Sequence, residues 1–172
     1  KAPKVDSVLC GLSRVPILYI PCSRMARYRI CSQGISMEIP MRLQLALDTT
    51  NLDVALKLVD DLQALVEIVE VGTPLILKEG SRAIREIKKR HPGQVVLADF
   101  KIMDAGAYEA EIAFEAGADI VSVLGAANDV TIQDAVDEAH QDGRQIMADL
   151  IAVEDVTGRA DFLNKIHGDY VC

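Results

Sequence analysis

Short runs of apolar, β-forming residues recur about every 25 residues along the chain between Met41 and Cys172. The segments between these runs carry apolar residues at helical spacing. Strands that are apolar throughout and alternate with helices are typical of βα units around a parallel sheet. The sequence therefore predicts an α/β fold. The expected strands are residues 43–47, 68–71, 95–98, 119–124, 145–149 and 169–172.

The helical segments carry signals for where they begin and end. Thr50 followed by Asp53 resembles a capping box at the start of the first helix. The second helix is expected to end in the basic residues 88–90, because cations suit the negative end of a helix dipole. The His-Pro-Gly sequence at 91–93 then stops that helix.

The number of expected strands limits which α/β architectures are possible. Residues 41–172 hold six expected strands and five intervening helical segments, which an open doubly wound sheet could also use. A (β/α)8 barrel needs eight strands, or about 200 residues at this spacing. Because the chain stops at Cys172, directly after a strand with no covering helix, we expect a (β/α)8 barrel truncated after its sixth strand.

The first forty residues differ in composition from the rest. They hold six basic and two acidic residues, a formal charge of +4, whereas residues 41–172 carry −12. Three of the four cysteines lie there, and four prolines interrupt any helical or strand period. We expect residues 1–40 to be an irregular basic extension unrelated to the incomplete barrel of 41–172. The alternative is a targeting or interaction arm.

Composition also excludes several kinds of partner. The acidic body of the chain repels phosphate backbones, so no nucleic-acid partner is expected. The longest apolar stretch near the N-terminus, residues 15–21, is far shorter than the roughly 20 residues of a membrane span. No cysteine pair has metal-site or disulfide-framework spacing, which favours a reducing compartment and a cytoplasmic protein.

Charged residues stand at the carboxyl ends of the expected strands. Asp48, Glu70 and Asp149 each end a strand, and Asp99 with Lys101 follows another on the face of Val95. These strand ends meet at one rim of a parallel barrel, where ligands bind. Taken alone, Asp48 could be a helix cap or a solvated loop residue, Asp149 could be structural, and Asp104 could be an N-cap. Glu70 is harder to explain in this way, because it interrupts an apolar run and an unpaired buried carboxylate costs free energy.

The combination favours a metal site. Asp48, Glu70 and Asp99 would gather three negative charges beside one amine, Lys101. Carboxylates placed so close repel one another unless a cation lies among them. Mg²⁺ fits best, since it needs few protein carboxylates and keeps waters that a substrate can displace. A metal with a nearby lysine could stabilise an oxyanion such as an enediolate.

The sequence of residues 99–106, D-F-K-I-M-D-A-G, resembles a signature of the orotidine-monophosphate-decarboxylase superfamily. Three further segments, at 43–48, 69–75 and 123–132, are similar to the 3-hexulose-6-phosphate synthase family within it. The resemblance runs from Met41 to Cys172, and residues 1–40 resemble nothing in that family.

The resemblance implies a homodimeric barrel enzyme, an aldehyde-lyase. It would condense formaldehyde with D-ribulose 5-phosphate to 3-hexulose 6-phosphate through a Mg²⁺-stabilised enediolate, or run the reverse cleavage. Glu70 and Asp99 would be the metal ligands, and Asp48 and Glu70 would contact the sugar phosphate. Lys101 and Asp99 would be catalytic. Asp104 would act in the partner subunit's site, which makes the site shared.

Two alternatives remain. 3-Keto-L-gulonate-6-phosphate decarboxylase has the same fold, metal site and enediolate chemistry, although residues 123–132 favour the synthase. A non-catalytic barrel fragment is the alternative of another class. By the resemblance, the strand-six histidine and the phosphate-binding amides would lie beyond Cys172, so we expect the full-length parent to be an enzyme and this segment alone to be inactive.

Overall fold

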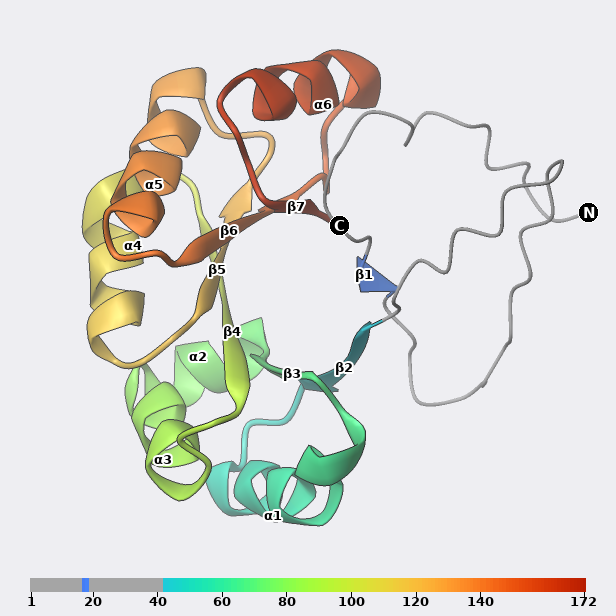
Figure 1. Cartoon of the computed structure of the whole chain (residues 1–172), viewed down its shortest axis with the longest axis vertical. Helices are drawn as coiled ribbons and strands as arrows, with labels where there is room; N and C mark the ends of the chain where they lie inside the picture. The colour runs from blue at the N-terminus through green and yellow to red at the C-terminus, as the bar shows by residue number, and fades with distance from the viewer. Residues whose placement is uncertain (1–16, 19–41) are drawn as a thin grey trace, which may run out of the picture.

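The structure is a computed structural model that describes residues 17–18 and 42–172. All seven strands in this part of the chain are parallel and are hydrogen-bonded in chain order, and the sheet curves into part of a (β/α)8 barrel (Figure 1). The strands are β1 (Ile17–Leu18), β2 (Arg42–Leu47), β3 (Ile68–Val71), β4 (Val95–Ile102), β5 (Ile120–Leu124), β6 (Gln145–Asp149) and β7 (Tyr170–Val171).

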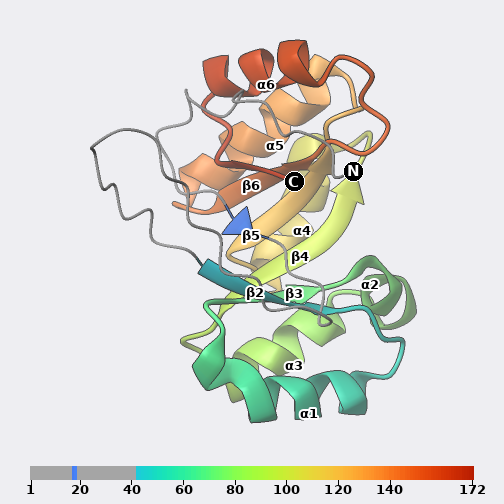
Figure 2. The ribbon, with the colours of Figure 1, turned by 90° about the vertical axis from the view of Figure 1, so that its right-hand side faces the viewer.

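Helices cover the outer face of this sheet, as Figure 2 shows from the side. They are α1 (Leu52–Leu62), α2 (Thr73–Glu79), α3 (Arg82–Arg90), α4 (Gly106–Glu115), α5 (Asp129–Gln141) and α6 (Val156–Lys165), with a short 3-10 turn, η1 (Gln63–Leu65), after α1. Among the described residues, no helix is long and apolar enough to cross a membrane.

The predicted alternation of six strands with helical segments is confirmed, with three local corrections. The segment after β3 forms two helices rather than one, because Gly80 (φ +59°) turns the chain between α2 and α3. The cap of α1 is Asn51, whose side chain accepts from the N–H of Val54, so the capping box at Thr50 is wrong. Finally, β4 continues to Ile102, which brings Asp99 and Lys101 inside the strand.

Most of residues 1–40 lie outside the described residues, including the three cysteines noted above. The part described is β1, which pairs in parallel with the start of β2, Ile17 opposite Arg42. The division into an extension of 1–40 and a barrel from 41 remains a prediction.

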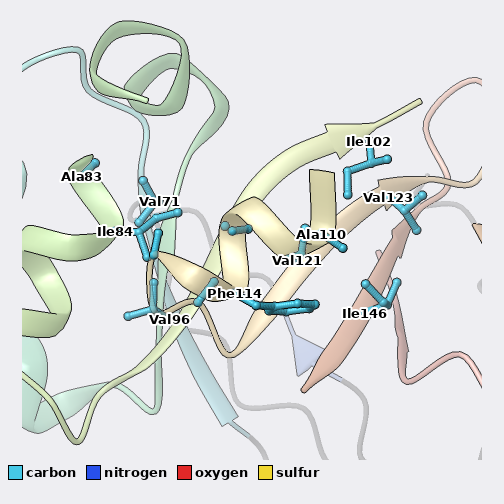
Figure 3. Packing of buried hydrophobic residues seen from close by; sticks show 14 of the residues in the cluster. Val71, Ala83, Ile84, Val96, Ile102, Ala110, Phe114, Val121, Val123 and Ile146 are labelled. Atoms are coloured by element: carbon cyan, nitrogen blue, oxygen red, sulfur yellow. The ribbon is translucent and has the colours of Figure 1, made fainter. Parts of the chain in front are cut away.

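An apolar cluster packs against each of the two faces of the sheet. The larger lies between strands and helices, where Ala83 and Ile84 of α3 turn toward Val71 and Val96 of the sheet (Figure 3). The smaller fills the inside of the curved sheet and consists of Ile68, Leu97, Ile120 and Met147. Burying both faces explains why the strands are apolar throughout.

Hydrogen bonds between side chains connect strands across the inside of the sheet at the amino-terminal ends of the strands. The Arg42 guanidinium donates to the Tyr170 hydroxyl (3.2 Å), and that hydroxyl donates to Gln145 Oε1 (3.1 Å). The link joins β2 to β7 across the described part of the sheet.

Candidate active site at the carboxyl ends of the strands

Side-chain alternation sets the position of the site. Each residue of the inner cluster is followed, two residues later on the same strand, by a polar residue. Residues two apart point to the same face, so these polar groups form the next layer toward the carboxyl rim. The layer contains Glu70, Asp99, Ser122 and Asp149.

Lys101 is the cation of this layer. Its Nζ lies 2.5 Å from Asp149 Oδ2 and 3.2 Å from Asp99 Oδ1. Burial acts to lower the pKa of Lys101, but the hydrogen bond to Asp149 and the charge of Asp99 outweigh it and raise the pKa above its usual value. The amine is therefore a fixed ammonium rather than a proton acceptor at neutral pH.

Asp99 is buried, with 8% of its surface exposed, and both its oxygens are engaged. Oδ1 accepts from the Ser122 hydroxyl (2.7 Å) and faces Lys101, while Oδ2 accepts from the Thr73 hydroxyl (2.6 Å). A carboxylate offers about four lone-pair sites. Ser122 and Lys101 occupy the two sites on Oδ1, and Thr73 occupies one of the two on Oδ2. The second site on Oδ2 is free of these contacts.

Glu70 lies among these charges and is strongly perturbed. Burial, and then the negative charge of Asp99, raise the pKa of Glu70 from 4.5 to about 7, although a hydrogen bond from Gln44 Nε2 (2.7 Å) acts the other way. Asp48 adds to the rise and Lys101 opposes it. The structure thus brings Asp48, Glu70, Asp99 and Lys101 together.

Asp48 reaches this group from the end of β2. Its side chain is exposed, and its Oδ1 lies against the Cα of Gly72, where any Cβ would collide with it. The glycine that caps α2 therefore makes room for the carboxylate.

Asp104 is not part of the group within one chain. It is exposed, its Oδ1 accepts from the N–H of Ala105 (2.8 Å), and Ala105 is the N-cap of α4. The capping interpretation of Asp104 is therefore wrong. Asp104 also helps raise the pKa of Glu109, after the larger effect of burial.

The residues present fit a hard cation through few protein ligands. Among the residues that the structure describes, no three His, Cys, Asp or Glu side chains form a metal-binding group. Glu70 and Asp99 lie close enough for the charge of Asp99 to raise the pKa of Glu70. Mg²⁺ is commonly held by one or two carboxylates plus waters and substrate. The raised pKa of Glu70 shows that a negative charge is poorly compensated here. The side-chain oxygen Oε1 of Gln44, which also contacts Glu70 through its Nε2, is buried without a hydrogen-bond donor. A bound cation would compensate both.

Sequence reasoning undervalued three groups here. The sequence predicts Asp149 at the rim and leaves a structural role open, whereas the structure makes it the nearest partner of Lys101. Thr73 and Ser122 were not predicted, although the structure places the hydroxyls of both on Asp99.

Fold and rim together define the class: a parallel (β/α)8-barrel protein with an acidic, lysine-containing site at the carboxyl ends of its strands. Residues 41–169 match the model of the orotidine 5'-phosphate decarboxylase / HUMPS family. The chain belongs to this family.

Individual proteins of this family are similar to the chain in sequence and structure. A 3-hexulose-6-phosphate synthase of Bacillus subtilis is 48% identical over 132 residues, which are 77% of this chain and 63% of that protein. A crystal structure of 3-hexulose-6-phosphate synthase matches with a TM-score of 0.74 and 45% identity, over 76% of this chain and 63% of the other. The 3-keto-L-gulonate-6-phosphate decarboxylase of Vibrio cholerae matches with a TM-score of 0.73 but 30% identity, over 76% and 60%. The chain spans about 63% of the length of the curated synthase from Bacillus.

Proposed function

We propose that the protein condenses formaldehyde with D-ribulose 5-phosphate to give 3-hexulose 6-phosphate, or catalyses the reverse cleavage. The observation that carries the proposal is the Lys101 ammonium held between Asp99 and Asp149 beside the perturbed Glu70. A fixed positive charge of this kind stabilises negative charge that develops on a substrate oxygen. The higher identity to synthases than to the decarboxylase favours this reaction within the family.

The substrate roles follow from exposure. Asp48 is exposed at the rim and is assigned to the hydroxyls of the sugar, with Glu70 below it as a second contact. Lys101 is assigned to the oxyanion of the enediolate. Asp99 is assigned to hold Lys101, so that the ammonium does not move as the charge forms.

Glu70 and Asp99 are the residues that would hold Mg²⁺. When bound, the ion supplies positive charge that stabilises the oxyanion and lowers the repulsion among the carboxylates. Asp99 has one free lone-pair site on Oδ2, which suits contact through a single oxygen.

A homodimer with a shared site would give Asp104 its role. Exposed apolar residues occur close to Asp104 in the chain: Met103 (51% exposed) precedes it, and Tyr108 (67%) and Ile112 (37%) lie four residues apart on α4. Exposed apolar residues rimmed by polar ones are typical of a surface that packs against a partner. Asp104 would then enter the partner subunit's site. The expected location is the cytoplasm.

Product analysis tests the proposal. The full-length parent expected from the family resemblance is incubated with formaldehyde, ribulose 5-phosphate and Mg²⁺, and loss of formaldehyde is followed together with formation of the hexulose phosphate. Lys101→Ala is expected to lower kcat by about 10²- to 10³-fold. Lys57→Ala, on the exposed surface of α1, is the matched control. Release of CO2 from 3-keto-L-gulonate 6-phosphate without use of formaldehyde would favour the decarboxylase, and no turnover of either substrate would favour a non-catalytic barrel.

A further inference from the structure

Ser122 lies at an irregular place in the sheet. The pairing of β4 with β5 is regular at Ala98 opposite Val121 and resumes at Ile102 opposite Val123. Three residues of β4, 99–101, therefore face the single residue Ser122 of β5. An insertion of this kind leaves main-chain groups without their ladder partners.

The Ser122 hydroxyl replaces the missing ladder bond. It accepts from the main-chain N–H of Lys101 (2.9 Å) and donates to Asp99 Oδ1 (2.7 Å). Ser122 is 1% exposed, so no water competes for either bond. A hydroxyl can accept and donate at once, which an alanine or valine at this position could not do.

The backbone that this bond holds is strained. Lys101 has φ +51°, in the left-handed region that costs a non-glycine residue free energy. Such conformations persist where surrounding contacts fix them, and they concentrate at functional sites. Here the turn directs the Lys101 side chain back toward Asp99 and Asp149.

We infer that Ser122 is the positioning residue of the site: its hydroxyl couples the left-handed backbone of Lys101 to the carboxylate of Asp99. Its effect on turnover rests on the proposed function, whereas its effect on the backbone does not. Ser122 touches neither the sugar nor the cation in this assignment. It acts through the two residues that it joins.

Amide hydrogen exchange, read residue by residue by NMR on the full chain, tests the inference without requiring activity. In Ser122→Ala, the Lys101 amide is expected to exchange roughly tenfold faster, the change that follows loss of one buried hydrogen bond. The amide of Val96, which is bonded to Asp119 Oδ2 at the other end of β4, should not change. Ser122→Thr keeps the hydroxyl and is expected to retain slow exchange at Lys101.

The control is Ser81→Ala, because the Ser81 side chain makes no capping hydrogen bond to α3. Unchanged exchange at Lys101 in Ser122→Ala would overturn the inference. Equal acceleration of Lys101 and Val96, or fast exchange in Ser122→Thr as well, would overturn it too. In the full-length parent, Ser122→Ala should lower kcat more than roughly tenfold with KM nearly constant. A change in KM alone contradicts the assignment. An inactive full-length parent with the expected exchange pattern would count against the proposed function alone.

Discussion

Replacing Glu70 with glutamine should stabilise the metal-free protein at alkaline pH. The pKa of Glu70 is raised from 4.5 to about 7, mainly by burial and then by the charge of Asp99. Below pH 4.5 the carboxyl is protonated in both the folded and the unfolded chain and costs nothing. Between pH 4.5 and 7 only the unfolded chain ionises fully, so the folded state loses stability as pH rises.

The size of the effect follows from the two pKa values. Each pKa unit corresponds to about 1.4 kcal/mol, so the difference amounts to about 3 kcal/mol of unfolding free energy above pH 7. Glutamine at this position keeps an oxygen that can accept from Gln44 but carries no charge. The variant is therefore expected to exceed the wild type by up to about 3 kcal/mol at pH 8 and by little at pH 4.5.

Urea unfolding in EDTA at several pH values between 4.5 and 8 measures this difference. Glu111→Gln, on the exposed surface of α4, controls for the loss of one carboxylate. Saturating Mg²⁺ should restore stability to the wild type at pH 8, by about 2.7 kcal/mol at a hundredfold excess over Kd, and should have a smaller effect on Glu70→Gln. A stability difference between wild type and variant that stays constant across this pH range would refute the reasoning.

Three other substitutions probe the site and the sheet. In the full-length parent, Gly72→Ala should displace the Asp48 carboxylate and raise KM for the sugar phosphate more than it lowers kcat, as steady-state kinetics would reveal; an unchanged KM contradicts this prediction. In the full-length parent, Asp99→Ala should abolish Mg²⁺-dependent activity and weaken Mg²⁺ binding measured by calorimetry, and retained turnover would count against the metal assignment. Asp119→Ala should cost about 2–3 kcal/mol in urea unfolding, because it removes partners of Lys88, Arg144 and the N–H of Val96 at once; a loss under about 0.5 kcal/mol would show that these bonds contribute little.

The regular parts of the fold could be predicted because they depend on local pattern. Strands buried on both faces need apolar residues throughout, and the helices between them need one apolar face. The strands therefore appear in the sequence as apolar runs, and the helices as apolar residues at helical spacing. The same logic placed the charged residues at the rim, because parity and strand direction follow once the strands are known. Asp48, Glu70, Asp99 and Lys101 meet for that reason.

The missed features depend on contacts between strands. The irregular pairing of β4 with β5 is set by how two strands meet, and neither strand shows it alone. The importance of Ser122 arises from that irregularity, and a serine in an apolar run carries no local signal. Likewise, Asp149 could be assigned to the rim, but its contact with Lys101 required the left-handed turn at Lys101.

The link from Arg42 through Tyr170 to Gln145 bears on how the chain folds. Arg42 and Tyr170 are 128 residues apart, so their contact closes a very long loop and forms only after the intervening units have found their places. Contacts of such sequence separation slow folding, and the transient species before closure expose unpaired strand edges. Weakening this link should therefore appear first in refolding kinetics and in aggregation during refolding.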